Sequence, residues 1–139
     1  MKHEPDEKQA YLDKLVQDRG YVLEYHKILV KHDFDAMVGI NQLLEAIYLR
    51  ERKLSRRDKE LLSVFGLVLV RAARGQIQSH IQVAVEEGVT AEELLELIEL
   101  VLPMAGFATF QIGFAAWCEY FKVEGMEPKV ATFEGGQPD

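Results

Sequence analysis

The chain has 139 residues, 48% of them hydrophobic, with a formal net charge of −7 and a pI near 5.1. This length and apolar content suit one domain with a buried core and leave no room for a second, so we expect a single domain over residues 1–139. The acidic balance argues against a nucleic-acid-binding protein, because neutralising phosphates requires a basic face.

The N-terminus is charged where a signal peptide needs an apolar run, and no apolar stretch reaches the roughly 20 residues of a membrane span. We therefore expect a soluble protein with no membrane partner. Its single cysteine, Cys118, excludes an intrachain disulfide and a cysteine zinc cage, which favours the reducing cytoplasm. Residues 1–7 are polar and carry Pro5, so we expect a frayed lead-in before a folded core over 8–121.

Three helices are predicted in the first part of the chain. Apolar residues recur at helical spacing from Tyr11 to Val16, until Gly20 breaks the pattern, and again from Val22 to Leu29. Asp33 or Asp35 can cap a third helix. Its apolar stripe is Met37, Ile40, Leu44 and Ile47.

The centre of the chain is a nearly unbroken apolar run, Leu61–Val70. Ser55, followed three residues later by Asp58, resembles a capping box, so this helix should start near Arg56. Because its interior is apolar nearly all round, the helix needs cover on every side, and self-association is a natural way to provide it. We therefore expect a homo-oligomer.

The next helix is predicted over Gln76–Glu87, after a break at Gly75 and before a left-handed turn at Gly88. Thr90 and Glu93 then form a capping box that opens another helix.

Pro103 is expected to end or kink the helix that Thr90 opens. Gly106 permits a close turn into a last helix, Phe107–Phe121. Residues 122–139 contain several glycines and prolines and few apolar residues, so we expect an arm or a disordered tail.

His80 is the first candidate for chemistry. Ile77, Ile81 and Ala84 place its ring at the edge of the helix's inward face, and Gln76 lies one turn earlier, where its amide can fix the tautomer of the ring. A neutral histidine is a common proton carrier near neutral pH. The alternative interpretation is a core histidine satisfied by one hydrogen bond.

Glu60, Arg71 and Arg74 share one stripe of the central helix, with the acid at one end and the arginines at the other. An arginine there can hold the carboxylate of a small ligand while His80 moves a proton. Alternatively, both arginines end the helix and face water, where they complement its dipole.

The position of the turn decides which residue meets His80. If the chain reverses at Gly75, Glu60 lies about 15 Å away and cannot cooperate with it. If the helix breaks near Arg71 to Ala73, His80 lies one turn from Glu60, and a carboxylate–imidazole pair is possible. The sequence leaves both positions open.

The remaining candidates read as structural. The aromatic series Phe107, Phe110, Phe114 and Trp117 can line a pocket, but such a series is more often core or subunit interface, and we favour the interface. Cys118 lacks a second thiol and reads as a small buried hydrophobe. The other histidines show no paired ligand spacing, so we expect no metal site.

Four pieces of sequence stand in a characteristic order: LSRRDKELL (54–62), SHI (79–81), GVTAEELLE (88–96) and AGF (105–107). In this order and spacing, the stretch from Leu54 to Phe121 resembles the carboxymuconolactone decarboxylase family, which shares a helical fold with alkylhydroperoxidase-D-like proteins. The resemblance implies an all-α, single-domain bundle of about six to seven helices that assembles as a trimer or hexamer.

By this resemblance, the function expected is a cofactor-free decarboxylation of a small lactone or related carboxylic acid. His80 would carry the proton, with Glu60 as its catalytic partner, although Glu60 falls about one residue from the position of the family glutamate. Arg71 or Arg74, with Gln76, would bind the substrate.

The peroxidase-type branch of the fold carries a CxxC pair before the histidine, and Ala73 and Gln76 stand at those two positions, so thiol-based peroxidase chemistry is not expected. Redox chemistry between chains through Cys118 ranks lower still. A non-catalytic, homo-oligomeric binding or accessory protein of the same family is the main alternative.

Overall fold

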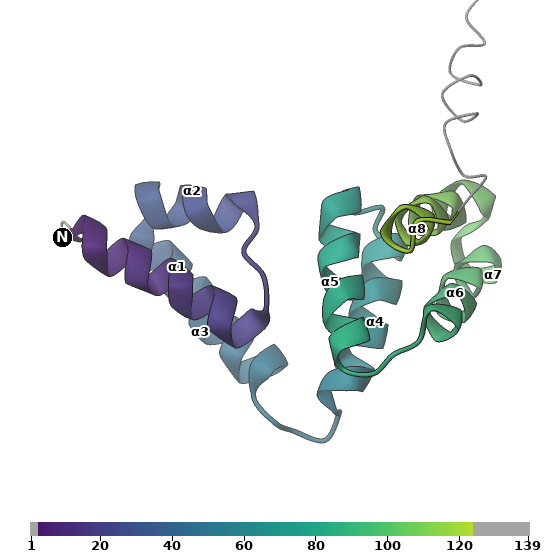
Figure 1. The fold of residues 1–139 in the computed structure, drawn as a ribbon, viewed down its shortest axis with the longest axis horizontal. Coiled ribbons are helices and arrows are strands. Elements are labelled where there is room, and N and C mark those ends of the chain that lie inside the picture. The colour runs from purple at the N-terminus through teal and green to yellow at the C-terminus, as the bar shows by residue number, and fades with distance from the viewer. Residues whose placement is uncertain (1–2, 124–139) are drawn as a thin grey trace, which may run out of the picture. The chain divides into compact units, whose positions relative to one another are not determined.

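The structure is a computed structural model that describes residues 3–123. Within this range the chain forms eight α-helices and one π-helix, and the described residues contain no strand (Figure 1). The predicted all-α class is therefore confirmed. No helix in the described part of the chain is long and apolar enough to cross a bilayer.

The chain divides into two compact units, one up to Lys59 and one from Glu60 onward. Each unit has its own buried cluster of apolar side chains. The expectation of one domain over the whole chain stays a prediction. From residue 124 onward, the predicted arm or tail lies outside the described residues.

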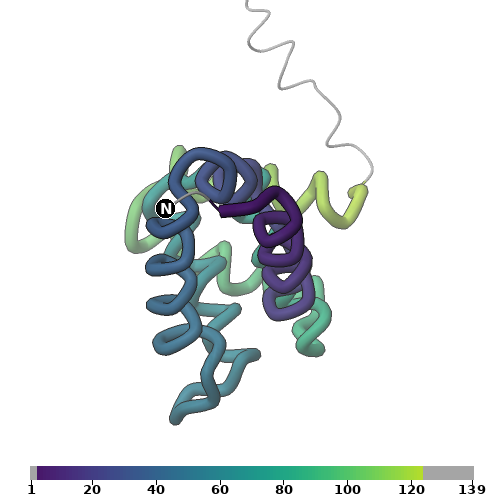
Figure 2. Tube along the Cα trace, turned by 90° about the vertical axis from the view of Figure 1, so that its left-hand side faces the viewer, coloured from purple at the N-terminus to yellow at the C-terminus, as the bar shows by residue number. Residues whose placement is uncertain are grey.

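Three α-helices and a π-helix make up the N-terminal unit. They are α1 (Pro5–Arg19), α2 (Glu24–His32), α3 (Phe34–Leu44) and η1 (Glu45–Leu49). The chain passes from α3 into η1 with helical backbone angles at Glu45, so the two form one continuous helix, which can be followed in Figure 2. The core of this unit consists of Leu15, Val30, Phe34 and Met37, with the partly buried side chains around them.

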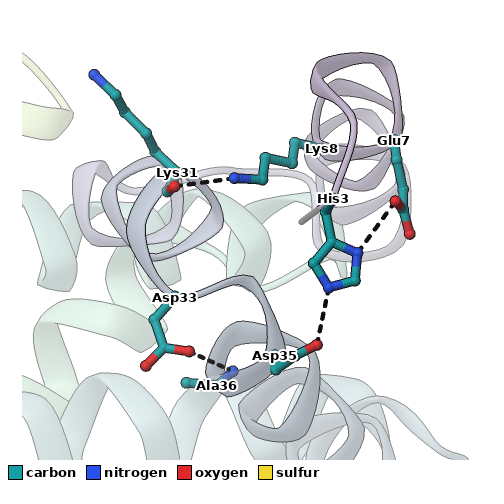
Figure 3. Close-up of polar contacts among 7 residues, drawn as sticks. All are labelled: His3, Glu7, Lys8, Lys31, Asp33, Asp35 and Ala36. Carbon is teal, nitrogen blue, oxygen red and sulfur yellow. Dashed lines mark hydrogen bonds and ion pairs between the residues drawn. The ribbon is translucent and has the colours of Figure 1, made fainter. Parts of the chain in front are cut away.

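The expected frayed lead-in is wrong for residues 5–7, because α1 already begins at Pro5. Residues 1–2 lie outside the described residues. Proline suits the first turn of a helix, where its missing N–H would have no helical partner. The ring of His3 lies between two carboxylates, with Nδ1 3.2 Å from Glu7 and Nε2 3.1 Å from Asp35 (Figure 3). These contacts connect the start of the chain to the first turn of α3.

Two further hydrogen bonds at this end of the unit are visible in Figure 3. The Lys8 ammonium donates to the Lys31 carbonyl of α2 at 3.0 Å. The Asp33 carboxylate accepts from the Ala36 N–H at 3.2 Å. Of the two predicted caps for the third helix, Asp33 is therefore the one observed.

The C-terminal unit contains α4 from Glu60 onward and all of the helices that follow. The bounds are α4 (Arg56–Leu69), α5 (Arg74–Glu86), α6 (Ala91–Glu99), α7 (Val101–Ala105) and α8 (Phe107–Tyr120). Helix α8 packs against α5, α6 and α7 (Figure 1). The core between these helices includes Val64, Val68, Ile77 and Ile81, all fully buried.

The helix ends that depend on local capping lie where the sequence predicts. Helix α4 begins at Arg56, and the Ser55 hydroxyl accepts from the Asp58 N–H at 3.0 Å. Before α6, the Glu93 N–H donates to the Thr90 hydroxyl at 3.1 Å, and the Thr90 N–H donates to the Glu93 carboxylate at 2.8 Å. The capping box at Thr90 is confirmed.

The helix that Thr90 opens was predicted to end or kink at Pro103, and it ends earlier. Helix α6 ends at Glu99, and Pro103 lies inside the short α7. A proline inside a helix clashes with the carbonyl four residues before it, which here belongs to Glu99. The predicted interruption is therefore observed one turn upstream of the proline. The last helix ends at Tyr120, one residue before the predicted end.

Gly113 of α8 gives a test of how closely the C-terminal unit is packed. A Cβ at this position would lie 2.7 Å from Val68 Cγ2 and 3.2 Å from Ile98 Cγ2. Valine is stiff at χ1, so we expect Gly113→Ala to lower the free energy of unfolding by about 1–3 kcal/mol. Urea denaturation measures this loss.

Gly66→Ala is the matched control, because a Cβ at Gly66 meets nothing within 4 Å in the middle of α4. Here alanine should raise the free energy of unfolding by up to about 1 kcal/mol through helix propensity. Equal stability of Gly113→Ala and the parent chain would contradict the close packing of α8.

Candidate functional site

The reversal between α4 and α5 determines which residues can meet. Helix α4 ends at Leu69, and α5 begins at Arg74. Arg71 has a left-handed φ of 59°, and Ala73 is extended with ψ 144°. These two residues turn the chain, so Gly75 lies inside the first turn of α5 and the expected break there is wrong. Of the two predicted positions for the turn, the one near Arg71 to Ala73 is observed.

This reversal brings His80 of α5 next to Glu60 of α4. His80 Nδ1 lies 2.9 Å from Glu60 Oε2, which is hydrogen-bond distance. The Glu60 side chain is fully buried, and the His80 side chain is 12% exposed. The two residues thus form a carboxylate–imidazole pair in which the carboxylate is shielded from solvent and the imidazole retains limited access to it.

Burial raises the pKa of the Glu60 carboxyl above its ordinary value of 4.5, because the charged form loses its hydration. The hydrogen bond and the charge of His80 act in the opposite direction, and the charges of Glu87 and Glu86 add to the effect of burial. We did not predict an influence of these two glutamates from the sequence. Because α5 runs back along α4, the end of α5 lies near the start of α4, and this places the two glutamates near Glu60.

The geometry of the pair favours a defined chemical role for His80. An ionised carboxylate only accepts hydrogen bonds, so Glu60 holds the proton of a neutral imidazole on Nδ1. Proton exchange with a substrate would then occur at Nε2. A carboxylate on one ring nitrogen also fixes the orientation of the ring, as general acid–base catalysis requires.

Gln76 lies one turn before His80 on α5 and is partly buried. We expected its amide to fix the tautomer of the ring, but the partner of Nδ1 is Glu60. The backbone carbonyl of Gln76 accepts from the Ser79 hydroxyl at 2.8 Å. Gln76 stays a candidate for contact with a ligand.

The two candidate arginines donate to α8. Arg71 Nη1 lies 3.3 Å from the Thr109 hydroxyl, and Arg74 Nη1 lies 2.8 Å from Glu119 Oε2. Arg74 is six residues before His80 on α5, or about 9 Å along the axis at about 1.5 Å per residue. The structure thus brings Glu60 and His80 together and connects both arginines to another helix.

The partners on α8 were not predicted, because they are 38 and 45 residues away in the sequence. A threonine and a glutamate on a mostly apolar helix were the available signal, since such residues in a packed helix usually have polar partners. The bond of Arg74 to Glu119 joins two side chains that are each 57% exposed, so it adds little to stability.

The aromatic residues of α8 form a connected series of ring contacts from Phe107 through Phe110 and Phe114 to Trp117. Phe110 and Trp117 pack against the core of their own unit, and the Trp117 indole donates to the Ala91 carbonyl at 2.8 Å. Packing on the core is therefore observed for these two residues, and a subunit interface along the same series stays a prediction. Phe107 is 65% exposed and stays available for such an interface.

Cys118 is buried in α8, and burial raises the pKa of its thiol, which disfavours the reactive thiolate. Ala73 precedes α5 and Gln76 lies in its first turn, where a redox pair would need two thiols. Among residues 3–123, no three or more metal-binding side chains come together. The absence of a metal centre stays a prediction.

One of the comparisons with known proteins gives a match. A family model described as "Carboxymuconolactone decarboxylase family" matches residues 35–119, which include both members of the Glu60–His80 pair. Searches of curated proteins and of solved structures each found no match to the chain.

The raised pKa of Glu60 predicts how its removal changes stability with pH. Below about pH 4.5 the carboxyl is protonated in both the folded and the unfolded chain, so folding buries no charge at this position. As the pH rises through the folded-state pKa, the buried group must ionise, and the parent protein loses stability. The stability of Glu60→Gln relative to the parent should therefore increase over this window and then level off.

Thermal denaturation across this pH range measures the difference between Glu60→Gln and the parent chain. Glu96→Gln, at an exposed position of α6, is the control for the loss of one negative charge. A difference that stays constant, or that decreases as the pH rises, would show that Glu60 is not held in an unfavourable environment for its charge.

Proposed function

The chain belongs to the carboxymuconolactone decarboxylase family, and from this we propose that it catalyses the cofactor-free decarboxylation of a small lactone or related carboxylic acid. The observation that carries the proposal is the 2.9 Å contact between Glu60 and His80. It supplies an oriented imidazole next to a buried carboxylate, in a matched part of the chain.

The reaction requires little of the protein. When the bond to the carboxylate carbon breaks, CO₂ leaves and its electron pair remains on the substrate, where a conjugated lactone can delocalise it. His80 first takes up a proton from solvent at Nε2, so that the ring is protonated on both nitrogens, and then delivers that proton to the carbanion carbon. Glu60 stabilises the ring in its protonated form and holds its orientation. The substrate itself serves as the electron sink, so no cofactor is needed.

Arg71 is the better candidate of the two arginines for binding the substrate carboxylate. Its guanidinium donates to the neutral Thr109 hydroxyl, a partner that a carboxylate can readily replace. Arg74 already pairs with the Glu119 carboxylate and would have to leave it. Gln76, one turn from His80, would donate its amide to the lactone.

The test is the decarboxylation of a carboxymuconolactone by the parent chain and by His80→Gln. Loss of the proton carrier should lower kcat by about a hundredfold or more. His32→Gln, at an exposed position in the last turn of α2, is the matched control and should leave kcat unchanged. Melting temperatures of the same samples separate loss of chemistry from loss of fold.

Turnover by His80→Gln at the parent rate per folded molecule would contradict the proposal.

A second candidate function is a non-catalytic binding or accessory protein. It is favoured by the pairing of Arg74 with Glu119, because Arg74 is one of the residues expected to bind the substrate and its guanidinium already has a partner. Carboxylate binding without turnover in the parent chain would support that function. A cytoplasmic location is part of either proposal and follows only from cysteine content.

We also propose that the protein is a homo-oligomer, either a trimer or a hexamer. Large apolar side chains of the C-terminal unit remain exposed, including Val70 at 73%, Met104 at 70% and Phe107 at 65%. Exposed apolar surface of this kind is typical of subunit contacts. Light scattering coupled to gel filtration should therefore give three or six times the 15.9 kDa chain mass.

A charge placed in this surface should dissociate the assembly. We expect the double variant Met104→Glu with Phe107→Glu to elute as a smaller species, because assembly would bury both charges. The matched control is the same pair of substitutions at Gln82 and Gln111, which are exposed polar positions. A monomeric parent chain at micromolar concentration would contradict the proposal.

A further inference from the structure

The N-terminal unit contains a cavity of about 590 Å³, open to solvent, at the end of α1 and along η1. Its walls carry charges of both signs. Asp18 and Glu45 supply carboxylates, Arg50 and Arg56 supply guanidinium groups, and Ala46 and Leu49 supply apolar surface.

Helix η1 places three of these residues on the cavity. Its defining bond runs from the Arg50 N–H to the Glu45 carbonyl, five residues earlier, at 2.8 Å. A π-helical turn is wider than an α-helical one and is often found at functional sites. Within this turn Glu45, Ala46 and Leu49 all line the cavity.

The Glu45 carboxylate is held in place from behind by buried polar groups. The Arg19 guanidinium donates from Nη2 to Asn41 Oδ1, and Asn41 Nδ2 donates to Glu45 Oε1 at 3.2 Å. Arg19 and Asn41 are each only 3% exposed. A buried guanidinium is costly unless a negative charge compensates it, and Asn41 connects Arg19 to Glu45.

The neighbouring His26 is uncharged, so it neither compensates the charge of Arg19 nor adds a second positive charge. It is fully buried, and desolvation, followed by the charge of Arg19, lowers its pKa to about 4, so the ring is neutral at ordinary pH. Lys14 reaches Glu45 from the solvent side at 3.8 Å, as an exposed pair of small energetic value. An ammonium group of a ligand can replace it.

The cationic side of the cavity is also ordered. The Arg56 guanidinium carbon lies 4.7 Å from the centre of the Tyr48 ring, in cation–π contact. The Lys59 ammonium donates to the carbonyls of Tyr48 and Arg50, at 3.0 Å each. These contacts fix the backbone at the end of η1 and the Arg56 guanidinium before any ligand arrives.

From this arrangement we propose that the cavity binds a small zwitterion, a carboxylic acid that carries an amino group at the other end of a short methylene chain. The ammonium would lie between Glu45 and Asp18, and the carboxylate would bind Arg50 and Arg56. The methylene groups would pack on Ala46 and Leu49. This site goes beyond the proposed decarboxylase function and uses none of its residues.

The probe is δ-aminovalerate, with valerate and pentylamine as controls that each lack one charged end. Calorimetric titration of the full chain should give a Kd for δ-aminovalerate at least about tenfold lower than for either control. Glu45→Gln keeps the oxygen that accepts from Asn41 but removes the charge, so it should weaken binding of δ-aminovalerate about tenfold. Glu24→Gln, exposed on α2, should bind like the parent.

A parallel pair tests the other wall: Arg50→Gln should weaken binding about tenfold, and Arg52→Gln, an exposed neighbour outside the cavity wall, should not. Three results would overturn the proposal. The first is no binding of δ-aminovalerate up to about 10 mM, and the second is an equal Kd for all three probes. The third is binding of δ-aminovalerate by both Glu45→Gln and Arg50→Gln that is as tight as in the parent chain.

Discussion

A buried carboxylate must have a partner, and the C-terminal unit is arranged so that Glu60 has one. An isolated charge in the interior costs several kcal/mol, and the contact with His80 Nδ1 offsets this cost. The contact requires one register of α5 against α4. Val64 and Val68, one and two turns beyond Glu60 on α4, share the core with Ile77 and Ile81 of α5. The same register therefore serves both the pair and the apolar core.

Features that depend on neighbouring residues could be read from the sequence. The caps at Ser55, Asp33 and Thr90 are each closed by a hydrogen bond spanning three residues. Such bonds are encoded by residue type and spacing alone. Together with the apolar periodicity, they defined the helical class and the start of α4. His80 and Glu60 were also identified as candidates from the sequence, but the sequence did not predict whether the two side chains meet.

Features that depend on distant residues could not be read in this way. Gly75 was the natural choice for a chain reversal, yet Arg71 adopts the left-handed conformation. A local pattern gives no reason for a non-glycine residue to accept that cost of about 1–2 kcal/mol. In the structure Arg71 closes α4, because the Ala72 N–H donates to the Leu67 carbonyl at 2.9 Å and the Arg71 N–H donates to the Val68 carbonyl at 3.0 Å. The side chain of Arg71 also donates to Thr109, 38 residues later. The pairing of Arg74 with Glu119 escaped prediction for the same reason.

The contact between Arg71 and Thr109 has a consequence for the order of events during synthesis. On the ribosome, α4 and α5 emerge before α8, so the reversal between them leaves the exit tunnel while Thr109 is still inside it. Until α8 docks, the hairpin lacks that hydrogen bond and the cover of its inner face. The contact between Glu60 and His80 joins α4 and α5, but the core around these two helices is complete only when α8 has left the ribosome.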